Sequence, residues 1–228
     1  RPLSRGLGDV YKRQIYGMPP LSLVIYTLAG GTLLAISANV MNQVLEVETD
    51  KLMERTSDRP IVTGELTKTN GIIYSISSGL IGFLILYFLV TPLSSFIGLA
   101  ANIFYVFIYT LILKPRTNQN IVIGGASGAA PVLIGWTATG SELETGPWVL
   151  FLLVFMWTPA HFWALSIENK ADYKNAEFPM LPIQESYKRT CIFIGIYSCS
   201  TVLISLVAAP ILQLGIIYLF VSIFFGVN

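Results

Sequence analysis

The chain has 228 residues, of which 54% are hydrophobic and 12% are charged, and its mean hydropathy is +0.66. A water-soluble domain of this length needs a charged surface around its core, so the composition excludes an ordinary soluble protein. The net charge of +1 is uninformative by itself, and no nucleic-acid partner is expected.

The first fourteen residues are polar and basic and lack the apolar segment of a signal peptide. Within them, Asp9–Gln14 resembles translated adaptor or vector sequence, with a basic juxtamembrane tail as the alternative. We expect residues 1–14 to be a non-native or disordered tail and residues 15–228 to be a single, incomplete membrane domain. The loop-like stretch Tyr16–Pro20 and the stop directly after an apolar run lead us to expect that both ends are cut.

Long apolar stretches without charge make up most of the remaining chain. Each is close to the roughly 20 residues that cross a bilayer as an α-helix, and no period-2 alternation favours a β-barrel. The sequence therefore predicts an all-α, polytopic transmembrane bundle. The seven expected spans are Leu21–Ala38, Gly71–Val90, Leu93–Leu113, Ile121–Ala138, Trp148–Ile167, Thr190–Ala209 and Ile211–Val227.

Basic residues beyond position 14 all fall in alternate loops between these spans. Because Lys and Arg concentrate in cytoplasmic loops, we expect a multi-pass protein of the cell's inner (plasma) membrane with these loops in the cytoplasm. The ten residues are Lys51, Arg55, Arg59, Lys68, Lys114, Arg116, Lys170, Lys174, Lys188 and Arg189.

A ladder of oxygen-bearing side chains follows the first span. Asn42, Glu46 and Asp50 are four residues apart, so on a helix they share one face. Oxygen ligands of this kind suit Mg²⁺, and the guanidinium groups of Arg55 and Arg59 suit phosphate oxygens. The sequence therefore indicates a magnesium and diphosphate site at a solvated helix end. An ordinary helix end with ion pairs four residues apart is the alternative.

A second polar cluster follows the fifth span. Asp172 lies between Lys170 and Lys174, and could face the first motif across the mouth of a cavity, where a solvated loop is the alternative. Inside that span, His161 indicates either a hydrogen bond between helices or a contact with a ligand. The small residues of Gly124–Ala130 indicate either close helix packing or room for a bulky ligand.

Three motifs, in this order, resemble the protoheme IX farnesyltransferases, or heme O synthases, a branch of the UbiA prenyltransferase superfamily. The first runs from Asn42 to the Glu-Arg-Thr-x2-Arg-Pro sequence that ends at Pro60, with Glu46 where many relatives have Asp. The second is Gln119–Pro131, and the third begins at His161 and ends in Pro-Met-Leu-Pro at Pro182. The resemblance covers nearly all of the chain after residue 15.

The resemblance implies a nine-helix bundle, about seven helices of which are present here, around a central cavity that opens to the cytoplasm. It implies farnesyl transfer from farnesyl diphosphate to a vinyl group of heme B, giving heme O by Mg²⁺-assisted ionisation to an allylic cation. Asn42, Glu46, Asp50 and Asp172 are then the expected catalytic and metal-binding residues. The expected substrate-binding residues are Arg55, Arg59, Lys170, Lys174, Tyr173, Arg116 and His161.

Other functions remain open at this stage. A related enzyme that prenylates an aromatic quinone precursor would share the diphosphate site, although the Pro-Met-Leu-Pro context favours heme. A transporter would more often show ionisable residues near the membrane midplane and a repeat between halves. A non-catalytic assembly protein is a further alternative. For an enzyme, the expected partners are the two substrates, the lipid bilayer and a downstream heme-modifying membrane enzyme.

Overall fold

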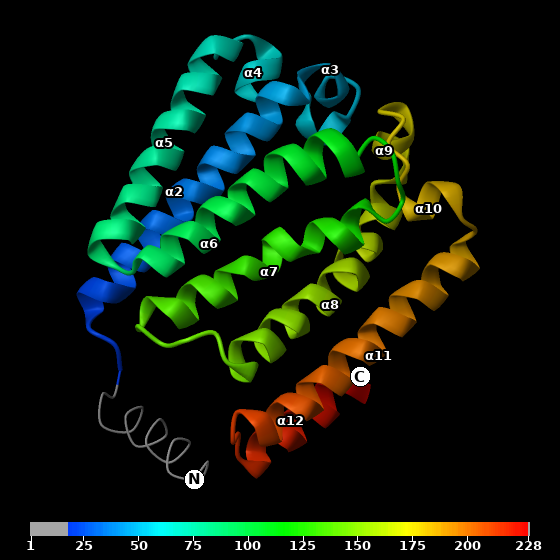
Figure 1. Ribbon diagram of the computed structural model, residues 1–228. Helices are drawn as coiled ribbons and strands as arrows, with labels where there is room; N and C mark the ends of the chain where they lie inside the picture. The colour runs from blue at the N-terminus through cyan, green and yellow to red at the C-terminus, as the bar shows by residue number, and fades with distance from the viewer. Residues whose placement is uncertain (1–17, 228) are drawn as a thin grey trace.

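The computed structural model describes residues 18–227, so the expected tail at residues 1–14 lies outside the described residues. Throughout the described range, the regular secondary structure is helical (Figure 1). The predicted all-α architecture is therefore confirmed. Long helices lie side by side, and short helices gather at one end of the bundle.

Six described helices are long and apolar enough to span a membrane, and the protein is an integral membrane protein. The last expected span, Ile211–Val227, starts later than predicted, because Pro210 lies inside the sixth long helix and the next helix, α12 (Ile216–Val227), begins at Ile216. The six spans are α2 (Leu21–Leu45), α5 (Lys68–Leu89), α6 with η2 (Pro92–Leu113), α7 (Asn120–Ala138), α8 (Thr145–Glu168) and α11 (Tyr187–Ile211).

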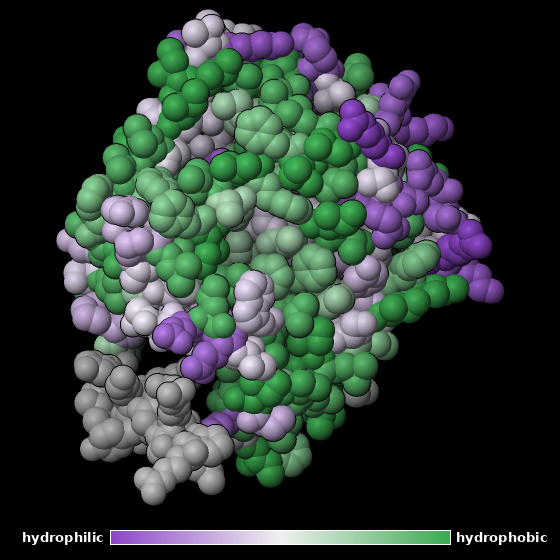
Figure 2. Space-filling model, in the orientation of Figure 1, coloured by the Kyte–Doolittle hydropathy of each residue, from purple (hydrophilic) through white to green (hydrophobic). Residues whose placement is uncertain are grey.

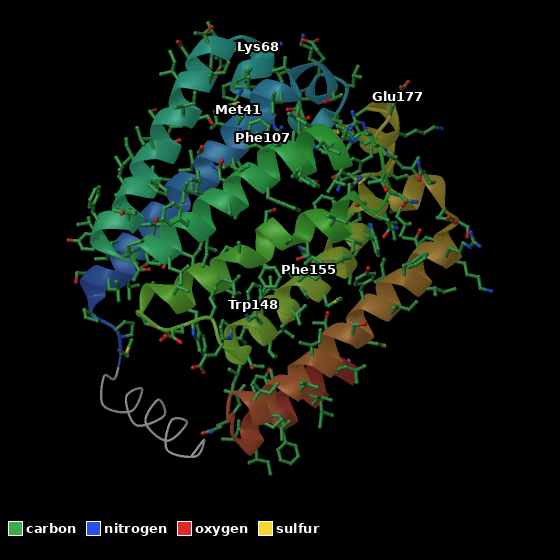
Figure 3. The ribbon with its side chains drawn as sticks, viewed as in Figure 1. Met41, Lys68, Phe107, Trp148, Phe155 and Glu177 are labelled. Atoms are coloured by element: carbon green, nitrogen blue, oxygen red, sulfur yellow. The ribbon has the colours of Figure 1, made fainter. Side chains whose placement is uncertain are left out.

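The short helices belong to the loops that carry the basic residues. Hydrophilic residues concentrate at this end of the molecule, whereas most of the visible remainder is hydrophobic (Figure 2). Lys68 and Glu177 lie at this end and Trp148 lies toward the opposite end (Figure 3). The bundle therefore has one strongly polar end. Its short helices are α3 (Val47–Asp50), η1 (Glu54–Thr56), α4 (Pro60–Thr63), α9 (Lys170–Asn175) and α10 (Leu181–Gln184).

Local sequence signals set several helix boundaries. At the start of three spans, a hydroxyl side chain accepts a hydrogen bond from the backbone N–H three residues later, which satisfies one of the unpaired amides of the first turn. At the end of α4, Gly64 has a φ of 85°, a conformation that glycine adopts without a steric penalty. The three capping residues are Thr67, Thr91 and Ser186.

The helices α2 and α6–η2 run parallel and in register. Asn102 donates to the Leu34 carbonyl at 2.8 Å, and Asn42 donates to the Thr110 hydroxyl at 3.2 Å. In each pair, the two residues are 68 positions apart in the sequence. A constant separation means that each step along one helix is matched by an equal step along the other. These hydrogen bonds fix one face of α2 against α6–η2 up to the polar end.

The second half of this span, η2 (Phe104–Leu113), is a π-helix. Its wider turn is visible in hydrogen bonds five residues apart, from the Thr110 hydroxyl to the Tyr105 carbonyl at 3.0 Å and from the Lys114 N–H to the Tyr109 carbonyl at 2.9 Å. π-Helical turns are rare and occur frequently at functional sites. This turn brings Thr110 and Lys114 to the face of η2 that meets α2.

Small residues on α7 allow it to approach η2 closely. A Cβ atom on Gly124 would lie 2.3 Å from Cδ2 of the Tyr109 ring, so no larger residue fits here without rearrangement. This contact supports the packing interpretation for the first residue of Gly124–Ala130. On the same helix, Gly128 has open space where its Cβ would be.

Candidate functional site

The first motif keeps its predicted spacing but is buried. The helix α2 ends at Leu45, and the backbone N–H groups of Glu46 and Asp50 still bond to carbonyls four residues earlier, at 2.9 and 2.8 Å. Asn42, Glu46 and Asp50 are 6%, 7% and 0% exposed. The expected solvated helix end is therefore wrong: the ladder faces the protein interior, because η2 and the following loop cover it.

Glu46 forms an ion pair that the sequence did not predict. Its Oε2 atom accepts a hydrogen bond from Lys114 Nζ at 2.5 Å, and the two side chains are 8% and 12% exposed. The ammonium group also lies 4.6 Å from the centre of the Phe178 ring, a cation–π distance. Lys114 therefore lies over the motif, held by a carboxylate on one side and an aromatic face on the other.

Asp50 is paired with one of the predicted arginines. Arg59 Nη1 donates to Asp50 Oδ2 at 2.5 Å, while the Asp50 side chain is only 1% exposed. The backbone carbonyl of Asp50 accepts a hydrogen bond from the Thr56 hydroxyl at 2.9 Å. The loop after the motif therefore folds back onto it and brings Arg59 to the carboxylate.

Two carboxylate oxygens of the motif are left without a partner. Glu46 Oε1 and Asp50 Oδ1 are buried and accept no hydrogen bond within the part of the chain that the structure describes. Buried acceptors of this kind are costly, and a bound cation is one way to satisfy them. No group of three or more His, Cys, Asp or Glu side chains comes together among residues 18–227. The site thus offers two carboxylates, those of Glu46 and Asp50, each with one oxygen that no described residue binds. Two carboxylates fit an ion such as Mg²⁺, which takes one or two of them and completes its shell with water and phosphate oxygens.

The two polar segments, for which facing positions across a cavity mouth and a solvated loop were both open, come together through direct hydrogen bonds. Asp172 Oδ1 accepts the backbone N–H of Glu54 and Oδ2 accepts that of Arg55, both at 3.2 Å. Next to it, burial raises the pKa of the Tyr173 phenol, and the neighbouring Arg55 guanidinium opposes that rise. The phenol therefore stays neutral at physiological pH and its hydroxyl remains a hydrogen-bond donor.

An apolar cluster lies beneath this contact. Met53, from the first loop, is 2% exposed and packs with side chains from η2, α7, α8 and the second loop. The loops are therefore joined by apolar burial as well as by hydrogen bonds. The other buried members of the cluster are Tyr109, Ile121, Trp163, Tyr173, Ala176, Phe178, Met180 and Leu181.

The remaining predicted residues lie apart from the paired carboxylates. Lys170, Lys174 and Arg116 are exposed in the loops of the polar end. His161 is exposed and stacks on Trp157, with ring centres 4.3 Å apart, and it forms no hydrogen bond to another described residue. Residues 161 and 163 are about 200° apart on a helix, so His161 is on the opposite face of α8 from the buried Trp163.

A groove of about 400 Å³ lies next to this aromatic pair. Residues of α8, α11 and α12 line it, among them Trp157, Ser205 and Ser222. The Ser205 hydroxyl bonds to Ser222 at 3.0 Å and to the Tyr218 hydroxyl at 2.8 Å, so these hydroxyl groups satisfy one another. The groove is otherwise lined by Thr201 and by aliphatic side chains.

Sequence reasoning missed Lys114 and Thr110 as members of the site. Lys114 was counted only as a basic loop residue, and Thr110 lies within an apolar span. The two residues are four apart, as are Asn42 and Glu46, and they pair with these in the same order. The sequence did contain a signal for this pairing. Thr110 and Lys114 are polar residues with the same four-residue spacing as Asn42 and Glu46, and they lie at the end of a nearby span.

Comparisons with known proteins identify related sequences. The chain is 44% identical to a protoheme IX farnesyltransferase of Cutibacterium acnes, over 92% of this chain and 63% of that protein. It is 42% identical to the protein of the same name from Synechocystis, over 92% of this chain and 67% of that protein. The chain therefore spans about two thirds of the length of the curated relatives it matches.

Solved structures of two archaeal proteins share the fold. A UbiA homologue of Archaeoglobus fulgidus bound to GPP and Mg²⁺ superimposes with a TM-score of 0.72, at 18% identity, over 89% of this chain and 71% of that one. The apo structure of a UbiA homologue from Aeropyrum pernix gives a TM-score of 0.77, at 16% identity, over 91% and 78%. The sequence also matches the UbiA prenyltransferase family over residues 14–227. The chain therefore belongs to the UbiA prenyltransferase family.

Proposed function

We propose that this protein transfers a farnesyl group from farnesyl diphosphate to a vinyl group of heme B, giving heme O. The observation that carries the proposal is the pair of buried carboxylates, Glu46 and Asp50, each with one cation-bound oxygen and one oxygen that no residue among 18–227 binds. An isoprenoid diphosphate needs a metal for its charge and basic side chains for its phosphate oxygens. The names of the curated relatives support the farnesyl donor and the heme acceptor.

Mg²⁺ is the proposed cofactor, held by Asn42, Glu46 and Asp50 with Asp172 at the facing segment. When bound, it stabilises negative charge on the leaving diphosphate. Each Asp172 oxygen that accepts an N–H retains a second lone pair, so the carboxylate can serve the metal as well. The solved archaeal homologue with GPP and Mg²⁺ supports this choice of ion.

Basic side chains of the chain bind and orient the diphosphate. Lys114 and Arg59 neutralise the motif carboxylates before substrate binds, and Arg55 lies beside the neutral Tyr173 hydroxyl. Fixed cations stabilise the charge that develops as the allylic C–O bond breaks, without reorganisation at that moment. The apolar bundle beneath the site then protects the farnesyl cation from water until the vinyl group attacks. Diphosphate is the leaving group, and a later addition of water to the resulting cation, with loss of a proton, gives the hydroxyethylfarnesyl group of heme O.

The heme acceptor requires further contacts at the polar end and in the membrane. The proposed ligands of the porphyrin propionates are the exposed side chains of Lys170, Lys174 and Arg116, since carboxylates pair with basic groups at this end. His161 offers an imidazole with no hydrogen-bond partner among the described residues, at membrane depth, for contact with the macrocycle. The proposed location is the cell inner membrane, with the polar end and the mouth of a central cavity facing the cytoplasm, near a downstream heme-modifying enzyme.

The product of the reaction tests the proposal. Membranes that contain the protein are incubated with heme B, farnesyl diphosphate and Mg²⁺, and the extracted hemes are analysed by mass spectrometry. Heme O is expected, and it should not form when EDTA replaces Mg²⁺. Parallel incubations with 4-hydroxybenzoate test the aromatic acceptor, and an aromatic product without heme O would overturn the assignment of heme.

A further inference from the structure

A carboxylate of α9 caps the short helix that begins at Glu54. The residue before this helix, Met53, has an extended backbone and provides no side-chain cap. The N–H groups of Glu54 and Arg55 are bound instead by the two oxygens of Asp172, each at 3.2 Å. The first N–H groups of a helix have no partner within it. Asp172 therefore acts as an N-cap from 118 residues away in the sequence.

We propose that Asp172 is a positioning residue that holds the 53–56 segment in place before metal or diphosphate binds. Since each oxygen binds a different N–H, the carboxylate fixes the orientation of two consecutive peptide groups as well as their distance. One of these peptides belongs to Arg55. The role of the Arg55 guanidinium in binding diphosphate rests on the proposed function. The hydrogen bonds from Asp172 that position the segment do not depend on that proposal.

Two further contacts join the same segments. Met53 is buried among Tyr173, Phe178 and Met180 from the second loop. The Arg55 side chain interacts with the Tyr173 hydroxyl. A thioether has several rotatable bonds and packs without directional preference, and a guanidinium acts at the end of a long flexible side chain. Of these contacts between the two segments, the hydrogen bonds of Asp172 are therefore the ones that constrain the direction of the backbone at residues 54 and 55.

A positioning role differs from metal ligation in the metal-free protein. If Asp172 acts only as a ligand for Mg²⁺, its replacement leaves the metal-free loop unchanged. If it holds the 53–56 segment, replacement frees the amides of Glu54 and Arg55 even when no ion is present. Amide hydrogen exchange reports this difference directly, because local opening governs exchange.

The test compares exchange in peptides that cover residues 47–60, in purified full-chain protein kept in EDTA without diphosphate. For Asp172→Ala, exchange at positions 54 and 55 should be roughly tenfold faster, as expected from the loss of charge-assisted hydrogen bonds. Asp172→Asn, which replaces an acceptor by a donor, should give a smaller increase. Asp172→Glu, which keeps both oxygens, should restore at least part of the protection.

Asp58→Asn is the matched control, because Asp58 is an exposed carboxylate of the same loop. It should leave exchange at positions 54 and 55 unchanged. Unaltered exchange in α2 and α5 shows that the Asp172 variants remain folded. If Asp172→Ala does not fold, the comparison is made with Asp172→Asn instead. The proposal is overturned if the amides of Glu54 and Arg55 exchange at the wild-type rate in folded Asp172 variants. Because the measurement needs no turnover, that outcome is independent of whether the protein makes heme O.

Discussion

At the scale of single residues, the site consists of acids whose charges are already compensated by bases. Lys114 and Arg59 each bind one oxygen of a buried carboxylate, and the second oxygen has no partner in the part of the chain that the structure describes. An isolated buried carboxylate would take up a proton rather than keep its charge. The two bases therefore offset the cost of burying these acids, and each acid keeps one oxygen that no described residue binds, available for a metal.

Removing a charge from the motif should weaken metal binding and lower activity. For Glu46→Gln or Asp50→Asn, we expect heme O formation to fall by about 100-fold or more at a fixed Mg²⁺ concentration, since each loses a ligand. Glu48→Gln is the matched control, because Glu48 is fully exposed and its low carboxyl pKa reflects surface contacts with Lys51 and Lys68. Wild-type Mg²⁺ dependence in both motif variants would remove this pair from the mechanism.

Removing Lys114 should destabilise the protein, because its partner, Glu46, stays buried without a compensating charge. Lys114→Met leaves the Glu46 carboxylate buried and unpaired, and breaking such a pair costs about 3–5 kcal/mol. The double variant with Glu46→Gln should recover most of that loss in thermal unfolding of the solubilised protein. Lys51→Met is the control, because its pair with Glu48 is exposed and worth less than about 1 kcal/mol. A double variant no more stable than Lys114→Met alone would contradict the coupling.

At the scale of helices and loops, the sequence predicted the spans well and the covering of the motif poorly. Uninterrupted apolar stretches locate five of the six long helices to within about three residues at each end, because membrane-spanning helices need that composition. The exception is α2, which continues seven residues beyond the expected end at Ala38, to Leu45. The spacing of Asn42, Glu46 and Asp50 also survives in the structure. Their burial could not be predicted, because it depends on the π-helical turn that brings Lys114 over Glu46, and composition does not reveal that turn.

The contact between α7 and η2 should be intolerant of even a methyl group. Gly124→Ala places a Cβ against the Tyr109 ring, and crowding of a packed core costs typically about 1–3 kcal/mol. Gly128→Ala, on the same helix with open space around its Cβ, should be neutral or slightly stabilising. Thermal unfolding of the two variants measures the difference. Equal stability would mean that the Tyr109 ring moves aside freely.

At the scale of the whole molecule, alternating helix directions bring all three basic loops to one end of the bundle (Figures 1 and 2). The sequence predicted this asymmetry from charge alone, since the short connections at the other end carry no Lys or Arg. It could not predict that α12 begins only at Ile216, because apolar composition continues across the turn before it.

The orientation of the bundle can be measured with cysteine labels. In a background where Cys191 and Cys199 are replaced by Ser, Lys188→Cys marks the polar end and Glu142→Cys marks the opposite end. A membrane-impermeant thiol reagent added to intact cells should label position 142 only, and position 188 should react after the cells are opened. The reverse pattern would place the polar end outside the cell.

The parallel register of α2 and α6–η2 has a consequence for evolution. Positions 34, 42 and 46 meet partners at a constant separation of 68, so changes at one helix must be matched at equal steps on the other. Loops between the two helices are free to lengthen or shorten, which changes the separation itself but leaves it equal for all three pairs. A single-residue insertion between Asn42 and Glu46 would rotate the carboxylate by about 100° and break only the last pair. When correlated substitutions among homologues are plotted as a residue-by-residue map, those between these two helices should therefore form a stripe parallel to the diagonal of the map. Between the two helices, viable insertions should be confined to the intervening loops.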